Sequence, residues 1–128
     1  MKYKIVKETK PALKNYGRDK AVAVHHQTIE TAQVCQEIQD NCSLKKSDVV
    51  AVLTELSEVI TRHLQRGDRV RLKDLGLLKL EIESDKVDAP EEFDVRKHIR
   101  NFRIHFLPES RKGHQEMYEN IQLKKVEG

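Results

Sequence analysis

The chain has 128 residues, with 24 Lys/Arg against 21 Asp/Glu for a formal net charge of +3, and only 5% aromatic residues with no Trp. This length suits one domain with a modest core, and the shortage of large apolar side chains predicts that a second copy completes that core. No apolar run is long enough to cross a bilayer, and the start, "MKYKIVKETK", lacks the apolar segment of a signal peptide. We therefore expect a cytoplasmic homodimer without membrane contact.

The charges are distributed unevenly along the chain. Residues 1–27 hold seven Lys/Arg against two Asp/Glu, and residues 99–128 hold six against four, whereas residues 28–98 hold 11 against 15. The basic surplus therefore sits at the two ends, which is where contacts with a polyanion are to be sought first.

Two short strands are predicted at the start, "KYKIVK" over 2–7 and "KAVAVHH" over 20–26, because apolar residues alternate with lysines. Pro11, Asn15 and Gly17 predict a loop or a wide hairpin between them. The lysines of this segment have two interpretations. They could bind nucleic acid as a basic arm, or they could protect an exposed edge strand against aggregation.

Two helices follow. The first begins at Thr28 or Thr31 and extends to Cys42, with an apolar face that includes both cysteines. The second covers "SDVVAVLTELSEVITRHLQRG", in which Gly67 occupies the position of a C-terminal stop. Its apolar residues recur at spacings of three and four: Val49, Val52, Leu53, Leu56, Val59, Ile60 and Leu64.

The segment "DRVRLKDLGLLKLEIES" predicts a hairpin with one buried face, because apolar and charged residues alternate on both sides of Gly76. The acidic stretch 84–98 leaves the sheet as an arm, with a helical turn begun at Asp88 and Pro90. In "IRNFRIHFLP" a third strand is expected. Pro108 then opens a short helix, "PESRKGHQEMYENIQL". In the third strand we expect Phe102, Ile104 and Phe106 to point inward, and Asn101, Arg103 and His105 outward.

Catalytic and metal sites are not indicated. The sequence shows no Ser/His/Asp arrangement, no pair of catalytic carboxylates and no phosphate loop, so we expect neither an enzyme nor a small-molecule substrate. The spacing of Cys35, Cys42 and the histidines matches no standard zinc motif, and both cysteines lie on the apolar helix face. Buried, reduced thiols are expected there, with no cofactor and no metal.

The order of elements resembles the HU/IHF family of bacterial histone-like DNA-binding proteins. The resemblance rests on "LKKSDVVAVLTELSEVITRHLQRGDRVRLKDLGLLKLE", which contains G-x-x-V-x-L-x-x-x-G, and on "IHFLPESRK" before the last helix. It covers about residues 28–120 and is closest to a variant HU-like branch with an N-terminal extension. Residues 1–27 would be that basic strand extension, and residues 28–128 the HU-like DNA-binding domain.

The resemblance implies an α+β fold with two N-terminal helices, a three-stranded antiparallel saddle sheet with an arm, and a short C-terminal helix. It also implies an intertwined homodimer that binds double-stranded DNA in the bacterial nucleoid, largely through phosphates and with little dependence on sequence. Glu81 and Glu83 stand where the family's outer strand face is basic, and Pro90 is followed by Glu91 and Glu92, which argues against intercalation.

Candidate DNA contacts come from the saddle, the start of the last helix and the N-terminal strands. Gly76 could offer backbone amides to phosphate, although the turn needs a glycine whether or not DNA binds. An HU-fold structural or protein-interaction module with weak or lost DNA binding is the alternative function. The candidate residues are Arg69, Arg71, Lys73, Gly76, Lys79, Arg100, Arg103, His105, Arg111, Lys112, Lys2, Lys4 and Lys20.

Overall fold

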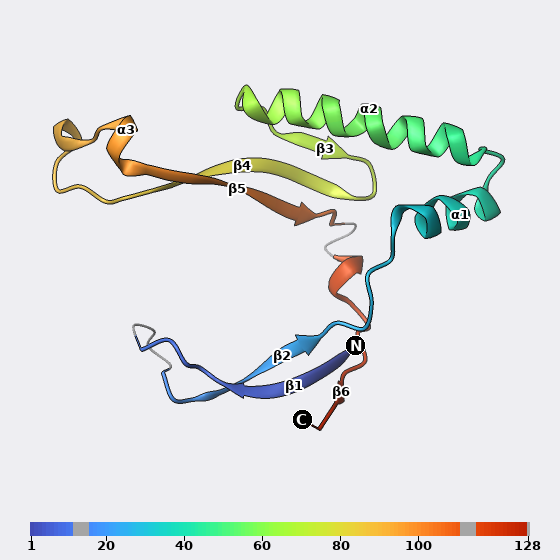
Figure 1. Cartoon of the computed structure of the whole chain (residues 1–128), viewed down its shortest axis with the longest axis horizontal. Coiled ribbons are helices and arrows are strands. Elements are labelled where there is room, and N and C mark those ends of the chain that lie inside the picture. The colour runs from blue at the N-terminus through green and yellow to red at the C-terminus, as the bar shows by residue number, and fades with distance from the viewer. Residues whose placement is uncertain (12–15, 111–114, 128) are drawn as a thin grey trace. The chain divides into compact units, whose positions relative to one another are not determined.

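The computed structural model describes residues 1–11, 16–110 and 115–127, which divide into two compact units. One unit combines residues 1–34 with 118–128, and the other is residues 35–117. The elements in chain order (Figure 1) are β1 (Lys2–Lys7), β2 (Asp19–Val24), α1 (Thr31–Asn41), α2 (Lys46–Gln65), β3 (Val70–Leu72), β4 (Gly76–Ser84), the 3₁₀ turn η1 (Pro90–Glu92), α3 (Val95–His98), β5 (Ile99–Pro108), η2 (Glu116–Tyr118) and β6 (Lys124–Lys125). This is an α+β fold with two three-stranded sheets, ordered β2-β1-β6 and β3-β4-β5.

The β2-β1-β6 sheet joins the two ends of the chain. β1 and β2 form the predicted hairpin, paired antiparallel from Lys2 with Val24 to Lys7 with Asp19. β6 adds a parallel strand on the other side of β1, which the sequence did not predict. Its pairing is continued by the amide of Val126, which donates to the carbonyl of Tyr3 at 2.9 Å.

The predicted helix from Pro108 to Leu123 is wrong for the residues that the structure describes in that segment. Pro108 ends β5 instead, and the amide of Glu109 donates to the carbonyl of Leu75 at 3.0 Å, which keeps the chain attached to the β3–β4 turn. Further on, η2 is a single 3₁₀ turn, and Asn120 has φ +57°, a left-handed conformation that a right-handed helix cannot contain. These backbone constraints prevent a continuous helix.

The helix α2 begins and ends with defined caps. At its start the amide of Lys45 donates to the carboxylate of Asp48 at 3.2 Å. At its end Gly67, with φ +90°, donates from its amide to the carbonyl of Leu64, while the amide of Asp68 donates to that of His63, both at 3.0 Å. This pair of bonds is a Schellman motif, and it confirms that Gly67 stops the helix.

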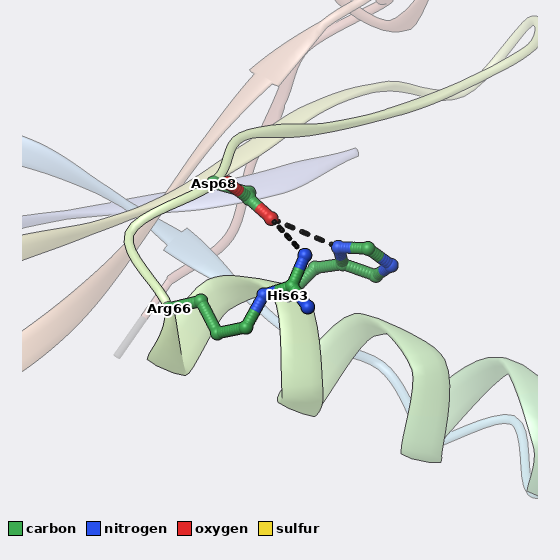
Figure 2. Close-up of polar contacts among 3 residues, drawn as sticks. All are labelled: His63, Arg66 and Asp68. Carbon is green, nitrogen blue, oxygen red and sulfur yellow. Dashed lines mark hydrogen bonds and ion pairs between the residues drawn. The ribbon is translucent and has the colours of Figure 1, made fainter.

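Asp68 ties the end of α2 to the start of β3 through its side chain (Figure 2). Its Oδ2 lies 2.9 Å from Nδ1 of His63 and 3.2 Å from a guanidinium nitrogen of Arg66. The hydrogen bond with His63 and then that from Arg66 lower the pKa of Asp68 below its ordinary value. The charged carboxylate is therefore the form that the folded state favours.

The register of the β3-β4-β5 sheet places apolar side chains on one face. Leu78 pairs with Phe106, Leu80 with Ile104 and Ile82 with Phe102, and directly opposed residues of neighbouring strands point to the same side. The alternation predicted from the sequence is therefore confirmed. Together with Val70, these residues define what we call the apolar face: Val70, Leu78, Leu80, Ile82, Phe102, Ile104 and Phe106.

Most of the apolar face is exposed in one chain. Phe102 and Ile104 are each 58% exposed and Ile82 is 60% exposed, so the expectation that they lie inward in a core is wrong for the single chain. The apolar residues that are buried in the described part of the chain are Cys35, Val49 and Leu64. The helix α2 contacts β3 and β4, which leaves the outer part of the β4–β5 ribbon uncovered (Figure 1).

The two cysteines have different environments. Cys35 is fully buried in α1, as expected, but Cys42 lies after the end of the helix at Asn41 and is exposed. Its thiol donates to the carbonyl of Ile38 at 3.1 Å. The expectation of two buried thiols on one helix face is therefore wrong for Cys42, because α1 ends one residue too early to include it.

Gly76 is required by the close approach of β5. It is the first residue of β4, it is buried, and it pairs with Leu72 on one side and Pro108 on the other. A Cβ atom there would lie 2.2 Å from the carbonyl oxygen of Leu107 and 2.8 Å from the ring of Phe106. The left-handed residue of the turn itself is Asp74, with φ +65°.

We predict that Gly76→Ala lowers the free energy of unfolding by about 2–4 kcal/mol, because the added methyl group overlaps backbone that cannot move without breaking the sheet. Gly67→Ala is the matched control. It also has a positive φ, but nothing lies within 4 Å of its Cβ position, so about 1 kcal/mol is expected. Urea unfolding followed by circular dichroism measures both, and equal losses would contradict the close-approach argument.

We predict that Asp68→Asn destabilises the protein at neutral pH and that this difference disappears in acid. A folded-state pKa that is lowered adds stability above the unfolded-state value and loses it as the pH falls through the folded value. Asp88→Asn is the control, since no hydrogen bond or ion pair of Asp88 is present among the described residues. Urea unfolding at neutral pH and at successively lower pH tests this. A difference that stays constant with pH would contradict it.

Candidate nucleic-acid interface

Four of the predicted saddle contacts lie on the polar face of the β3-β4-β5 sheet, opposite the apolar face: Arg71, Lys79, Arg103 and His105. The register pairs Lys79 with His105 and Glu81 with Arg103, so these four side chains are direct neighbours. Arg71, on β3, pairs with Leu77 and belongs to the same face. Arg103 and His105 thus point away from the apolar face, as the sequence predicted.

Glu81 lies at the centre of this polar face and contacts three of the candidate groups. Its carboxylate is 3.8 Å from Nζ of Lys79, 3.7 Å from the guanidinium of Arg103 and 3.0 Å from Nδ1 of His105. Glu83 lies 3.5 Å from Nε of Arg103 as well. A phosphate approaching these groups must compete with carboxylates that are already in place.

Two further candidates also have acidic partners. Arg71 lies 3.3 Å from Glu109, and Arg100 forms a hydrogen-bonded ion pair with Asp85 at the base of the arm. The hydrogen bond from Arg100 to Asp85 raises the pKa of the guanidinium further. Both arginines are exposed and their carboxylate partners are partly buried, and each pair neutralises a charge that DNA would need.

Arg69 and Lys73 are different, because the described residues provide no ion pair for either of them. Arg69 precedes β3, Lys73 lies in the turn after it, and both side chains are exposed. Gly76 lies nearby but is buried between two strands, which accounts for this glycine without a ligand. The predicted contacts Arg111 and Lys112 lie outside the described residues.

In the β2-β1-β6 sheet, as in the β3-β4-β5 sheet, the strand register determines which side chains share a face. Alternate residues of a strand point to opposite faces, and paired residues share a face. One face therefore carries Lys2, Lys4, Lys20 and Lys124, with Val6, Val22 and Val24 between them, and we call it the lysine face.

The opposite face of this sheet is mainly apolar. Tyr3, Ile5, Ala21 and Ala23 lie on it. Most of a hollow of about 470 Å³ is lined by Met1, Tyr3, Ala21, Ala23 and Leu123. This face also carries Lys125 and an ion pair between Lys7 and Asp19, 3.7 Å apart.

The candidates on the lysine face differ in their partners. Nζ of Lys20 lies 2.6 Å from the carboxylate of Glu8, whose side chain is 9% exposed. This hydrogen bond, with a second from the amide of Lys10, lowers the pKa of Glu8. No acidic partner is present among the described residues for Lys2 and Lys4. Lys124 was not among the predicted contacts, because "LKKV" is too short a segment to predict a strand.

The net charge differs between the two compact units. The unit of residues 1–34 and 118–128 contains nine Lys/Arg against five Asp/Glu, a net charge of +4. The unit of residues 35–117, with the saddle sheet, contains 15 against 16, a net charge of −1. The net positive charge of the chain therefore lies in the unit that contains the two termini.

The tip of the arm contains two short helical segments, η1 and α3. Pro90 is the first residue of η1, and α3 follows with Asp94 as its N-cap, accepting from the amide of Arg96 at 2.8 Å. The ring of His98 accepts from the amide of Asp94 at 2.8 Å and packs against Phe93. Figure 1 shows this tip at the far end of the β4–β5 ribbon.

Among the described residues, no group of His, Cys, Asp and Glu has the arrangement of a metal site. In the same part of the chain, no helix is long and apolar enough to cross a membrane.

A family model described as an HU domain fused to wHTH, Ig, or Glycine-rich motif (HU-HIG) matches residues 1–125. The chain belongs to this HU-HIG family. Because the match begins at residue 1, it includes β1 and β2 as well as the saddle sheet. The resemblance to HU proteins inferred from the sequence is therefore confirmed.

Among solved structures, the chain is similar to one from Bacteroides vulgatus ATCC 8482 that is described as a candidate bacterial DNA-binding protein. The TM-score is 0.64 at 11% sequence identity, and the match covers 98% of this chain and 47% of the other. The chain therefore spans about half the length of that protein, and the likeness is one of fold. No curated protein matches the sequence.

Proposed function

We propose that this HU-HIG protein binds duplex DNA as a homodimer, mainly through phosphates and with little dependence on base sequence. Family membership supports DNA as the partner. The observation that carries the proposal is the set of exposed cations with no acidic partner among the described residues, which includes Arg69, Lys73, Lys2 and Lys4. Such groups release counterions on contact with DNA, and this release drives binding that is independent of sequence.

The exposed apolar face supports the homodimer. Phe102, Ile104 and Ile82 form one continuous strip across β4 and β5, and α2 exposes Val52 and Val59 in addition. A contiguous apolar surface of this kind is costly in water unless another surface covers it. The HU fold suggests that a second copy of the chain covers this strip with its own. The two copies would then form the intertwined dimer that the resemblance to HU proteins implies.

The arm supports binding without intercalation. Pro90 is fixed in the first turn of η1, and two glutamates follow it directly. Those carboxylates are repelled by phosphates, which opposes entry of the tip into the minor groove. Contact through phosphates and the flexibility of the duplex then determine which stretches of DNA the protein binds. The proposed location is the cytoplasm, on the nucleoid.

The alternative is a structural or protein-interaction module that kept the HU fold and has weak or lost DNA binding. The contacts of Glu81 favour it, since Lys79, Arg103 and His105 are all engaged by that one carboxylate. The negative net charge of the saddle unit points the same way. The two functions differ in one measurable property, the affinity for duplex DNA at low salt.

A gel-shift titration with a random-sequence duplex tests the proposal. We predict binding at low salt whose affinity falls by about 10³ or more between roughly 50 and 200 mM salt, as expected for six or more phosphate contacts per dimer. A duplex of different base composition should give the same affinity within a few-fold. Absence of binding at low salt would instead support the interaction module.

Sedimentation equilibrium tests the homodimer. We predict that the protein sediments as a dimer and that Ile104→Glu, which buries a charge in the proposed interface, shifts it to monomer with loss of stability. Asn101→Glu is the matched control, because it adds one carboxylate to the opposite face of β5. A wild-type protein that is a stably folded monomer would refute the shared core.

A further inference from the structure

We propose that the lysine face of the β2-β1-β6 sheet is the principal DNA-binding surface of this chain, and that Lys2, Lys4 and Lys124 contact the phosphates of duplex DNA. The proposal rests on the proposed function, because it names the surface where that binding takes place. It transfers the main contact from the saddle sheet to the sheet formed by the two ends of the chain.

The register brings these three lysines together. Lys2 and Lys124 are direct partners on neighbouring strands, which lie about 5 Å apart, and Lys4 is two residues from Lys2, about 7 Å along β1. Duplex DNA carries one phosphate charge for about every 1.7 Å of helix axis. A row of ammonium groups at these spacings therefore meets several phosphates at once.

The charges on the lysine face are not cancelled by carboxylates. The acid on this side of the β1–β2 hairpin is Glu8, and Lys20 already neutralises it at 2.6 Å. Asp19, the other acid of the two strands, lies on the opposite face with Lys7. On the saddle sheet, by contrast, Glu81 and Glu83 stand among the basic groups.

Protection of an edge strand does not account for Lys2. That residue lies on the central strand of the sheet, between Val24 of β2 and Lys124 of β6. A lysine is useful against aggregation where backbone groups are unpaired, and at Lys2 both sides of the strand are paired.

The composition of the lysine face favours duplex over single-stranded DNA. Valines occupy the positions between the lysines, and the aromatic residue of β1, Tyr3, points to the opposite face. Single-strand binding surfaces depend on aromatic side chains that stack with bases, and this face has none on its described strands. An aliphatic surface with lysines suits a continuous phosphate backbone.

Two double variants of the full chain test the proposal. Lys4→Gln with Lys124→Gln removes two charges from the lysine face. Lys7→Gln with Lys125→Gln removes the same charge from the same strands on the opposite face. We expect the first variant to bind a random-sequence duplex about ten-fold or more weakly at roughly 100 mM salt, and its log–log salt slope to fall by about 0.9 for each phosphate that is no longer neutralised. The affinity of the second variant for the same duplex should stay within about three-fold of that of the wild type.

The outcomes separate this proposal from the proposed function. If the wild type binds no DNA at low salt, both fail. If the wild type binds and the two variants are weakened equally or not at all, the lysine face is refuted while DNA binding stands. In that case Arg69→Gln with Lys73→Gln, on the saddle unit, should abolish most of the binding.

A footprint of the wild-type protein tests the same surface without any variant. Acetylation of lysines in the presence of the duplex, read by mass spectrometry, should show protection of Lys2, Lys4 and Lys124. Lys7 and Lys125 should be modified at the same rate with and without DNA. Equal protection on both faces, or protection of Lys73 alone, would overturn the proposal.

Discussion

The pairing register between β4 and β5 is the constraint on which the rest of the saddle unit depends. Because Leu78 opposes Phe106 and Glu81 opposes Arg103, the apolar face lies on one side of the ribbon, and the charged groups Lys79, Glu81, Glu83, Arg103 and His105 lie on the other. Gly76 makes this register possible, since no Cβ fits beneath the backbone of β5 at that position. A shift by one residue would place Glu81 on the apolar face and Phe102 among the ion pairs. The exposed apolar strip and the ion pairs around Glu81 are thus two results of one alignment.

The two sheets of the chain differ in how many of their basic residues are paired with carboxylates. The saddle sheet belongs to the matched HU domain, and its carboxylates already contact Lys79, Arg103 and His105. The sheet built from the two ends of the chain has positive charges without such competitors on its lysine face. The proposed division of labour follows from these facts: the saddle unit supplies the dimer and the rigid frame, and the terminal sheet supplies most of the contact with DNA. Where basic residues are already paired with carboxylates of the same protein surface, DNA would have to displace those carboxylates, and this lowers the free energy gained on binding.

The regular elements could be predicted from the sequence because local rules determine them. The 3.6-residue period predicted α2, the Schellman glycine Gly67 predicted its end, and the alternation of apolar residues predicted β3, β4 and β5. The strand β6 could not be predicted, since two residues carry no period of their own and pair only because β1 offers a free edge. The predicted C-terminal helix failed for a related reason. It was predicted from Pro108 as an opening residue, but the hydrogen bond from Glu109 to Leu75 and the left-handed Asn120 are tertiary and backbone features that this local signal does not include.

By itself, the sequence determined the HU-like order of elements, the faces of the saddle strands and the surplus of positive charge at both ends. These properties depend on residues that are close together in the chain. Only the tertiary structure decided which cations have acidic partners and which lysines share a face, because both depend on register between distant segments. Lys124 joins Lys2 across 122 positions of sequence, and Arg71 meets Glu109 across 38. No local pattern encodes such neighbours, and the proposed DNA-binding surface depends on them.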